Sequence, residues 1–169
     1  MIQIYCGDGK GKTSAAVGAA VRAAGQGMKV YYCQFMKGNP CGEISILKEV
    51  PGITVLRPEK QYPFYKEMNP EEKKAICQEH DALVEKLEEV ADEQHTMIIL
   101  DELTYPVKYH LIDEARLNRF LESRQETELI ITGRDPWQAI LDKADCVTEC
   151  KKIKHHFDRG IPAKKGIEY

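Results

Sequence analysis

A glycine-rich loop near the start of the chain limits the possible fold more than any other feature of this sequence. The apolar run Ile2 to Cys6 precedes it, the loop from Gly7 to Thr13 reads Gly-Asp-Gly-Lys-Gly-Lys-Thr, and the alanine-rich stretch 13–24 follows. A strand, a glycine-rich loop and a helix in this order are typical of phosphate-binding loops, whose backbone N–H groups face an anion at the helix N-terminus. The loop therefore predicts an α/β fold that binds a nucleoside triphosphate.

The loop differs from the strict Walker A pattern at one position. That pattern would require a glycine where this chain has Cys6. The three loop glycines still allow backbone N–H groups to turn toward phosphates, while Lys12 can neutralise their charge and Thr13 can offer a hydroxyl to magnesium. A strand-to-helix turn without a ligand is the alternative, but it does not explain two lysines and a Thr-Ser pair. A dinucleotide-binding fingerprint would need glycine in place of Lys12.

The length and composition of the chain suit a single globular domain over residues 1–169. It is 43% hydrophobic and 30% charged, and its net charge of -3 gives no overall positive field that would attract nucleic acid or a membrane surface. Only the segment 151–165 is basic, which fits a solvated tail or an anion-binding segment. No apolar run reaches the roughly 18 residues of a membrane helix, and no C-x-x-C pair is present. We expect a cytoplasmic protein with reduced cysteines, no nucleic-acid partner and no membrane contact.

Short apolar runs separated by stretches with helical periodicity predict alternating strands and helices. The predicted strands are Ile2–Cys6, Lys29–Phe35, Ile53–Leu56, Met97–Leu100, Glu128–Thr132 and Cys146–Glu149. The predicted helices are Thr13–Ala24, one from Pro70 to Ala91 capped by Asn69, one over Asp113–Ser123 and a short one from Pro136. Strands this apolar are buried on both faces. The fold class is therefore α/β, a three-layer P-loop NTPase-like (RecA-like) arrangement with a mostly parallel sheet and helices on both faces.

Two carboxylates follow the apolar run Met97 to Leu100. Asp101 and Glu102 stand where a Walker B strand carries the residue that holds magnesium beside the phosphates. Many strands end in Asp or Glu, so the phosphate loop is what makes this interpretation specific.

Three other groups of residues each have two interpretations. Arg134 follows a predicted strand at the edge where ligands of open α/β sheets bind, but a plain turn explains it equally well. Arg22, on the helix after the loop, fits a nucleotide contact or a surface ion pair. The aromatic residues Tyr62, Phe64 and Tyr65 form either a small separate core or an apolar platform for a flat ligand.

Several motifs together resemble a known family. In chain order they are Gly7 to Ala16, Gln34 to Gly38, Gly42-Glu43, Leu100 to Tyr105, Ile131 to Arg134, Ala144-Asp145 and Lys154 to Gly160. The series resembles the single-domain P-loop ATP:corrinoid adenosyltransferases, which are distinct from the trimeric helical-bundle and the ethanolamine-linked enzymes. The resemblance spans nearly the whole chain.

The resemblance implies a reaction. In this family the 5'-deoxyadenosyl group of ATP moves to the cobalt of a reduced corrinoid, either cobalamin or a biosynthetic precursor, and inorganic triphosphate leaves. Co(I) is the nucleophile that attacks the ribose C5', so the protein needs no nucleophile of its own. It is expected to place C5' in line with cobalt and to neutralise charge on the triphosphate.

The resemblance also implies roles for individual residues. ATP, with its phosphate order reversed relative to kinases, is expected on Gly7, Asp8, Gly9, Lys10, Gly11, Lys12, Thr13, Ser14, Arg22 and Arg134. Mg²⁺ or Mn²⁺ is expected on Thr13, Asp101 and Glu102, the corrinoid on Tyr62, Phe64, Tyr65, Glu102 and Tyr105, and the catalytic residues are Lys12, Thr13 and Glu102. An aromatic loop in this family displaces the lower axial ligand of cobalt, which makes Co(II) easier to reduce.

The implied partners are ATP, the reduced corrinoid, an external electron donor such as a flavoprotein, and a second copy of the chain in a homodimer. Two features differ from the family pattern. Family members commonly have a segment ahead of the first strand that folds over the corrinoid, whereas the first predicted strand here begins at Ile2. The aromatic loop reads Tyr-Pro-Phe-Tyr rather than Phe-x-Trp.

Two other functions fit a phosphate loop. A phosphotransferase acting on a small metabolite could use Asp101 or Glu102 as its base. A nucleotide-gated regulatory protein would need a switch segment, and none is clear in the sequence.

Overall fold

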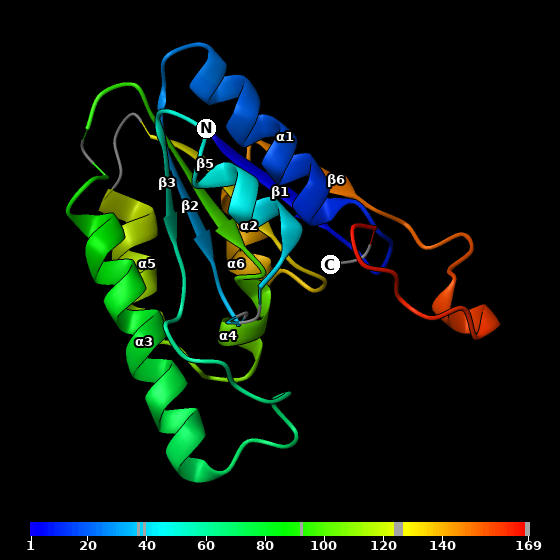
Figure 1. Ribbon diagram of the computed structural model, residues 1–169. Coiled ribbons are helices and arrows are strands. Elements are labelled where there is room, and N and C mark those ends of the chain that lie inside the picture. Colours follow the sequence, from blue (N-terminus) through cyan, green and yellow to red (C-terminus); the bar gives the residue numbers. More distant parts are fainter. Residues whose placement is uncertain (37, 39, 92, 124–126, 168–169) are drawn as a thin grey trace.

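The sheet at the centre of the molecule has six strands, each parallel to its neighbours (Figure 1). The computed structural model describes residues 1–36, 38, 40–91, 93–123 and 127–167. Across the sheet the strands are β3 (Ile53–Leu56), β2 (Lys29–Gln34), β4 (Thr96–Asp101), β5 (Glu128–Thr132), β1 (Ile2–Cys6) and β6 (Cys146–Glu149). Every strand lies within one residue of its predicted bounds, so the predicted parallel α/β fold is confirmed.

Helices cover both faces of the sheet. The helices are α1 (Lys12–Gly25), α2 (Gly42–Leu47), α3 (Pro70–Glu88), α4 (Thr104–Lys108), α5 (Glu114–Ser123) and α6 (Gln138–Lys143), with a short 3₁₀ helix η1 (Phe157–Arg159). Side chains of α1 and α2 form a core with one face of the sheet, and side chains of α3, α5 and α6 form a second core with the other face. These three layers confirm the predicted architecture.

Alternate residues of β4 show how the sheet divides the two cores. Met97 and Ile99 lie in the core with α1 and α2, whereas Ile98 and Leu100 lie in the core with α3 and α5. This alternation follows from the two-residue repeat of a strand. All residues of β4 are buried, because helices cover both of its faces.

Helix α3 begins at its predicted capping residue. The Asn69 side chain accepts a hydrogen bond from the Glu72 N–H, and the Glu72 carboxylate accepts one from the Asn69 N–H, each at 2.8 Å. The predicted end at Ala91 is wrong, because the helix stops at Glu88 and the next residues form a turn. Ala91 still packs on the core from that turn, which explains why it continued the helical pattern.

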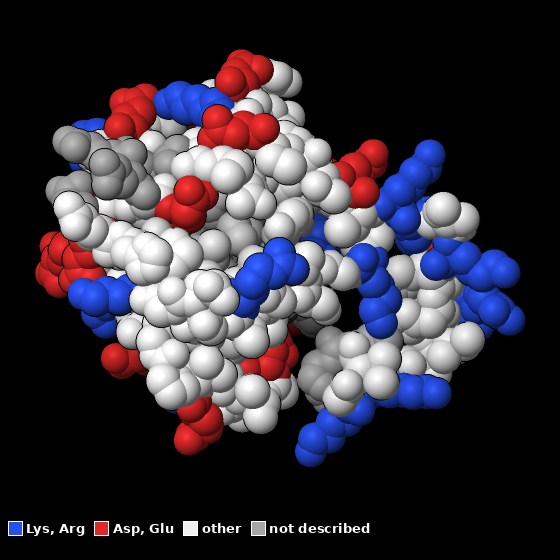
Figure 2. Space-filling model, turned by 90° about the horizontal axis from the view of Figure 1, so that it is seen from above, with Lys and Arg blue, Asp and Glu red and all other residues white. Residues whose placement is uncertain are grey.

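The chain after β6 forms an extended arm, residues 150–167, on the right-hand side of Figure 1. Figure 2 shows Lys and Arg gathered on that side of the molecule, whereas both signs of charge are mixed over the body. Ile153 is 91% exposed and Phe157 is 79% exposed. The predicted basic segment therefore lies on an arm that adds little to either core. No helix in the described part of the chain is long and apolar enough to cross a membrane.

Candidate functional site

The phosphate loop joins β1 to α1 at the carboxyl edge of the sheet. Gly11 is the N-cap of α1 with φ 110°, a left-handed conformation that glycine adopts at little cost. The Lys12 side chain is largely buried, and its Nζ donates a hydrogen bond of 2.7 Å to the Gly9 carbonyl oxygen. This bond holds the ammonium group within the curve of the loop. Cys6, where the Walker pattern has glycine, is the last residue of β1, and burial raises the pKa of its thiol.

The reason for glycine at two loop positions differs from the predicted one. The Gly9 N–H donates to the Cys150 carbonyl oxygen at 2.7 Å, so this N–H does not point toward a phosphate as expected. A Cβ at Gly9 would lie 2.6 Å from the Cys150 oxygen, and one at Gly7 would lie 2.7 Å from it. Both glycines are required because the segment after β6 packs directly against the loop.

Asp101, the last residue of β4, is completely buried and accepts hydrogen bonds from three side chains. The Thr13 hydroxyl lies 3.0 Å and the Thr132 hydroxyl 2.7 Å from Oδ1, and the Gln34 amide nitrogen lies 3.2 Å from Oδ2. Hydrogen bonds to an ionised carboxylate are stronger than those between neutral groups. Two residues predicted to share a magnesium ion, Thr13 and Asp101, are thus in direct contact.

Gln34 and Thr132 are site residues that the sequence prediction missed. Each ends an apolar buried strand, β2 or β5, and has no solvent exposure. The available signal was that both residues lie in motifs of the series, Gln34 to Gly38 and Ile131 to Arg134, and that each is a polar residue near the carboxyl end of a predicted apolar strand, where a buried polar group needs a polar partner.

The oxygen donors at this site suit a hard divalent cation. Magnesium commonly takes one or two protein oxygens and completes its shell with water and substrate phosphates. Thr13 and Asp101 supply such oxygens at the loop. The described residues contain no cluster of three or more His, Cys, Asp or Glu that could enclose a metal ion without a substrate.

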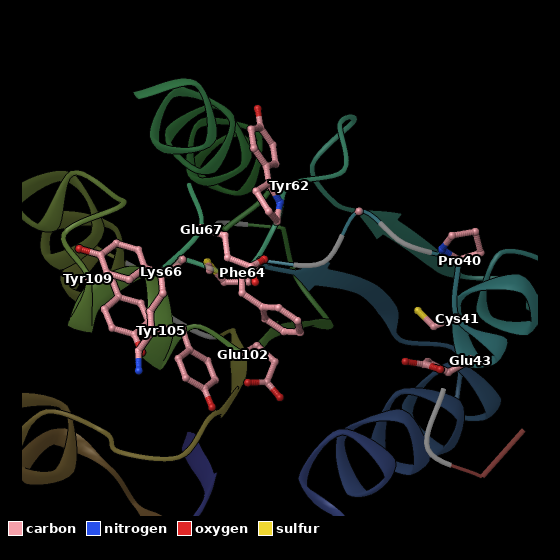
Figure 3. Close-up of a pocket in the computed structure, with 14 residues that line it drawn as sticks. Pro40, Cys41, Glu43, Tyr62, Phe64, Lys66, Glu67, Glu102, Tyr105 and Tyr109 are labelled. Atoms are coloured by element: carbon pink, nitrogen blue, oxygen red, sulfur yellow. The ribbon is translucent and has the colours of Figure 1, made fainter. Parts of the chain in front are cut away.

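An apolar cleft with a volume of about 930 Å³ is lined by residues that follow β2 and β4, among them Met36 and Glu102 (Figure 3). All five residues predicted to contact the corrinoid line this cleft, namely Tyr62, Phe64, Tyr65, Glu102 and Tyr105. Tyr109, which was not predicted, stacks on Tyr65 with ring centroids 4.1 Å apart and lies 6.0 Å from the Tyr105 ring. The three tyrosines form one wall that could face a flat ligand.

The loop that carries the predicted aromatic residues is tied to α3. The Tyr62 hydroxyl donates to Glu79 at 2.6 Å, and this carboxylate, together with burial, raises the pKa of Tyr62 to about 12. Phe64, in contrast, is 84% exposed. Its ring lies over the open part of the cleft in Figure 3.

Glu102 connects the buried carboxylate to the cleft. It follows Asp101 directly, has a left-handed backbone with φ 62°, and donates its N–H to the Thr132 hydroxyl at 2.9 Å. This conformation is uncommon outside glycine and is often found at functional sites. Its carboxylate lies in the cleft near Tyr105, where burial and this charge raise the pKa of the Tyr105 phenol. Glu102 therefore lines the cleft directly next to Asp101 in the chain.

Four of the remaining residues that were predicted to contact the nucleotide lie on the phosphate loop, beside it or hydrogen-bonded to it. Asp8 is exposed on it and accepts a hydrogen bond of 3.1 Å from the Lys152 N–H, which lowers the pKa of the Asp8 carboxyl. Lys10 and Ser14 are exposed on or beside the loop, and the backbone of Arg134 is tied to it through a hydrogen bond from Gly7 N–H of 3.0 Å.

Arg22 is not brought to the loop. It lies in the last turn of α1, nine residues after Thr13, or roughly 14 Å along the helix axis. Its contact with ATP stays a prediction. Lys37, part of the motif from Gln34 to Gly38, lies outside the described residues.

Comparison with known proteins identifies relatives over the full length of the chain. A family model described as ATP:corrinoid adenosyltransferase BtuR/CobO/CobP matches residues 1–169. A corrinoid adenosyltransferase of Escherichia coli is 38% identical over 171 residues, which cover 100% of this chain and 85% of that protein. The corrinoid adenosyltransferase CobA of Salmonella typhimurium is 37% identical with the same coverage, and one from Sinorhizobium is 31% identical over 100% of this chain and 80% of its own length.

Proposed function

The chain belongs to the ATP:corrinoid adenosyltransferase family BtuR/CobO/CobP, and from this membership we propose which of its residues carry the reaction. It is a corrinoid adenosyltransferase, an enzyme that transfers the adenosyl group of ATP to a corrinoid. The observation that carries the proposal is the adjacency of Asp101 and Glu102. One faces the phosphate loop and the other lines the aromatic cleft, so two substrates bound at these sites would lie side by side.

Triphosphate binds to the loop from Gly7 to Gly11, with Lys10 and Lys12 as its cations. Reversed phosphate order directs the ribose toward the cleft. The new bond forms between cobalt and C5', while the C5'–O bond breaks and its electron pair leaves with triphosphate. Lys12 neutralises charge that grows on this leaving group, which is the charge that a transferase of this kind has to stabilise. Arg134 and, less directly, Arg22 are further candidates for nucleotide contacts.

Thr13 and Asp101 hold Mg²⁺ or Mn²⁺ beside the phosphates. The cation supplies positive charge to the triphosphate, and the Thr132 hydroxyl and Gln34 amide keep the Asp101 carboxylate in position. Glu102 belongs to the corrinoid side of the site, because its carboxylate lies in the cleft.

The corrinoid lies in the aromatic cleft, with Phe64 against the lower face of cobalt. The exposure of Phe64 supports this choice of ring, because Tyr62 is fixed by Glu79 and Tyr65 is stacked on Tyr109. Placing an apolar ring below cobalt removes the lower ligand and makes Co(II) easier to reduce.

Further parts of the proposal concern the state of the protein in the cell. Residues 1–169 act as one domain and as a homodimer, and an external donor such as a flavoprotein supplies the electron. The protein works in the cytoplasm, which agrees with the finding that none of its six cysteines forms a disulfide.

Replacing Lys12 with Ala tests the role of the phosphate loop. Adenosyl transfer to chemically reduced cobalamin should fall by at least about 100-fold, because one charge that stabilises the leaving group is lost. Equilibrium binding of cobalamin should be retained, since the cleft is unchanged. Product formation is followed by the corrinoid spectrum and by triphosphate release.

The exposed residue Lys48, after α2, provides the matched control as Lys48→Ala, which should behave as the wild type. Full transfer activity in Lys12→Ala would contradict the proposal. Release of ADP in place of triphosphate by the wild type would contradict the bond-breaking step.

A further inference from the structure

His80 is fully buried in α3, and both of its ring nitrogens are engaged. Nδ1 lies 2.8 Å from the Leu111 carbonyl oxygen, and Nε2 lies 3.3 Å from the Met36 backbone nitrogen. Because a carbonyl oxygen can only accept a hydrogen bond, Nδ1 carries the ring proton and Nε2 accepts from the Met36 N–H. His80 is therefore the neutral tautomer that joins two segments far apart in the sequence.

The two segments that His80 joins both contribute to the aromatic cleft. Met36 follows β2 and lines the cleft directly. Leu111 follows α4, in the segment that carries Tyr105 and Tyr109, and it is a core residue of a small cluster against which Met36 and Tyr109 pack. One imidazole ring thus links these two parts of the cleft through a hydrogen bond to each.

The backbone at Met36 needs such support. Its φ of 62° is left-handed, a conformation that costs free energy in any residue with a side chain and that persists when neighbouring contacts enforce it. The hydrogen bond to His80 satisfies the N–H of this residue. The preceding residue, Phe35, also contacts the imidazole, with ring centroids 5.3 Å apart at an interplanar angle of 63°.

We propose that His80 is a positioning residue for the corrinoid. It holds Met36 and Leu111 in place, and so fixes the separation of the cleft walls that receive the flat ring. His80 itself does not line the cleft, so it acts through these two residues and the stacked tyrosines beside them. The inference rests on the proposed location of the corrinoid in this cleft.

Two substitutions of His80 separate its hydrogen bonds from its bulk. His80→Phe keeps an aromatic ring against Phe35 but removes both hydrogen bonds. His80→Gln places one donor and one acceptor on its terminal amide and can restore both. We expect His80→Phe to raise the KM for chemically reduced cobalamin about tenfold while the KM for ATP stays within about twofold of wild type. In His80→Gln the KM for cobalamin should stay within about threefold.

Amide hydrogen exchange provides a readout that does not depend on activity. The Met36 N–H should exchange faster in His80→Phe and at nearly the wild-type rate in His80→Gln, because only the first variant lacks an acceptor. Phe120→Leu is the matched control. It removes volume from a buried site on α5 and should lower Tm without changing the KM for cobalamin.

Several results would overturn the inference. They are an unchanged KM for cobalamin in His80→Phe, an equal rise of both KM values, or the same KM change in Phe120→Leu. Failure of the proposed corrinoid site would look different, because Phe64→Ala would then also leave the KM for cobalamin unchanged.

Discussion

Asp101 and Glu102 are consecutive residues in two different environments. Asp101 ends β4 and accepts a hydrogen bond from Thr13 on α1, whereas the left-handed backbone of Glu102 turns its side chain into the aromatic cleft. The proposed triphosphate site and the proposed corrinoid site therefore each contain one of two consecutive residues, which places the sites next to each other. Alkyl transfer needs this closeness, since C5' must reach bonding distance of cobalt in the right orientation.

The stability of the fold should depend on pH through His80. Burial lowers the pKa of His80 below its ordinary 6.5, although Asp81 and Glu79 on the same helix oppose the shift. Below about pH 6.5 the unfolded state therefore binds more protons than the folded state. The stability that the neutral, buried His80 contributes to the free energy of unfolding is fully present above that pH. It declines as the pH falls toward the lowered pKa of His80.

Urea unfolding of wild type and His80→Gln between about pH 5 and about pH 7.5 checks this dependence. Glutamine does not titrate, so the variant should lose less stability on acidification than the wild type. Identical pH dependence in the two proteins would show that another group is responsible.

The sequence assigned roles to residues of the phosphate loop and of the acidic strand end, but it did not show which other residues surround Asp101. Thr13 and Asp101 belong to recognisable motifs, and the structure brings them into contact. Gln34 and Thr132 reach Asp101 only because β2 and β5 are the two neighbours of β4 in the sheet. The chain alone does not state that order, since several orders of parallel strands fit the same alternation of strands and helices.

At the scale of elements, the strands and the capped helix were predictable, and two of the short helices were not. Strand β4 is an apolar run buried under helices, whereas all residues of β6 are exposed, and α3 carries a capping box that fixes its start. Helices α2 and α4 have six and five residues, too few for a helical repeat to be visible, and α4 contains Pro106. The interpretation of the loop glycines was also incomplete, because the segment after β6 approaches them from the other end of the chain.

Gly9 and Gly18 are two glycines whose replacement by Ala should have opposite effects. A Cβ at Gly9 would overlap the Cys150 carbonyl, so Gly9→Ala should lower the free energy of unfolding by about 1–3 kcal/mol and reduce adenosyl transfer. Gly18 lies within α1 with nothing within 4 Å of an added Cβ. Gly18→Ala should raise the free energy of unfolding by about 0.5–1 kcal/mol and keep activity.

Denaturant unfolding and the transfer assay, applied to both variants, test this contrast. Equal stability of Gly9→Ala and wild type would mean that the segment after β6 can move away from the loop without cost.

At the scale of the whole molecule, charge is divided between the arm and the body. Residues 150–167 carry six Lys or Arg and one Asp, a net charge of +5, so the rest of the chain carries −8 of the total of −3. The arm also exposes Ile153, Phe157 and Ile167. Several exposed apolar side chains on one arm favour contact with another surface. An acidic second copy of the chain complements the basic arm, which supports the proposed homodimer.

Replacing Ile153 and Phe157 together with Ser should weaken the dimer. Both residues are largely exposed, so the variant should fold normally, while its dimer dissociation constant in sedimentation equilibrium should rise about tenfold or more. High salt should weaken the wild-type dimer as well, by screening the opposite charges.

The matched control replaces the exposed residues Glu71 and Lys74 with Ser, which leaves the net charge unchanged, on α3, across the molecule from the arm (Figure 1). It should leave the dissociation constant unchanged. A wild-type protein that stays monomeric at roughly 50 µM would contradict the dimer, and a double Ser variant that dimerises normally would contradict the role of the arm.

The contact between the phosphate loop and the segment after β6 has a consequence for the synthesis of the protein. Ile2 is hydrogen-bonded to Asp145, 143 residues later, and Asp8 to Lys152, 144 residues later. Strand β1 precedes every other strand of the sheet in the chain, yet both of its neighbours in the sheet, β5 and β6, are the last two strands in chain order. The first strand and the phosphate loop of a nascent chain therefore cannot take their final places in the sheet until β5 and β6 have also been made.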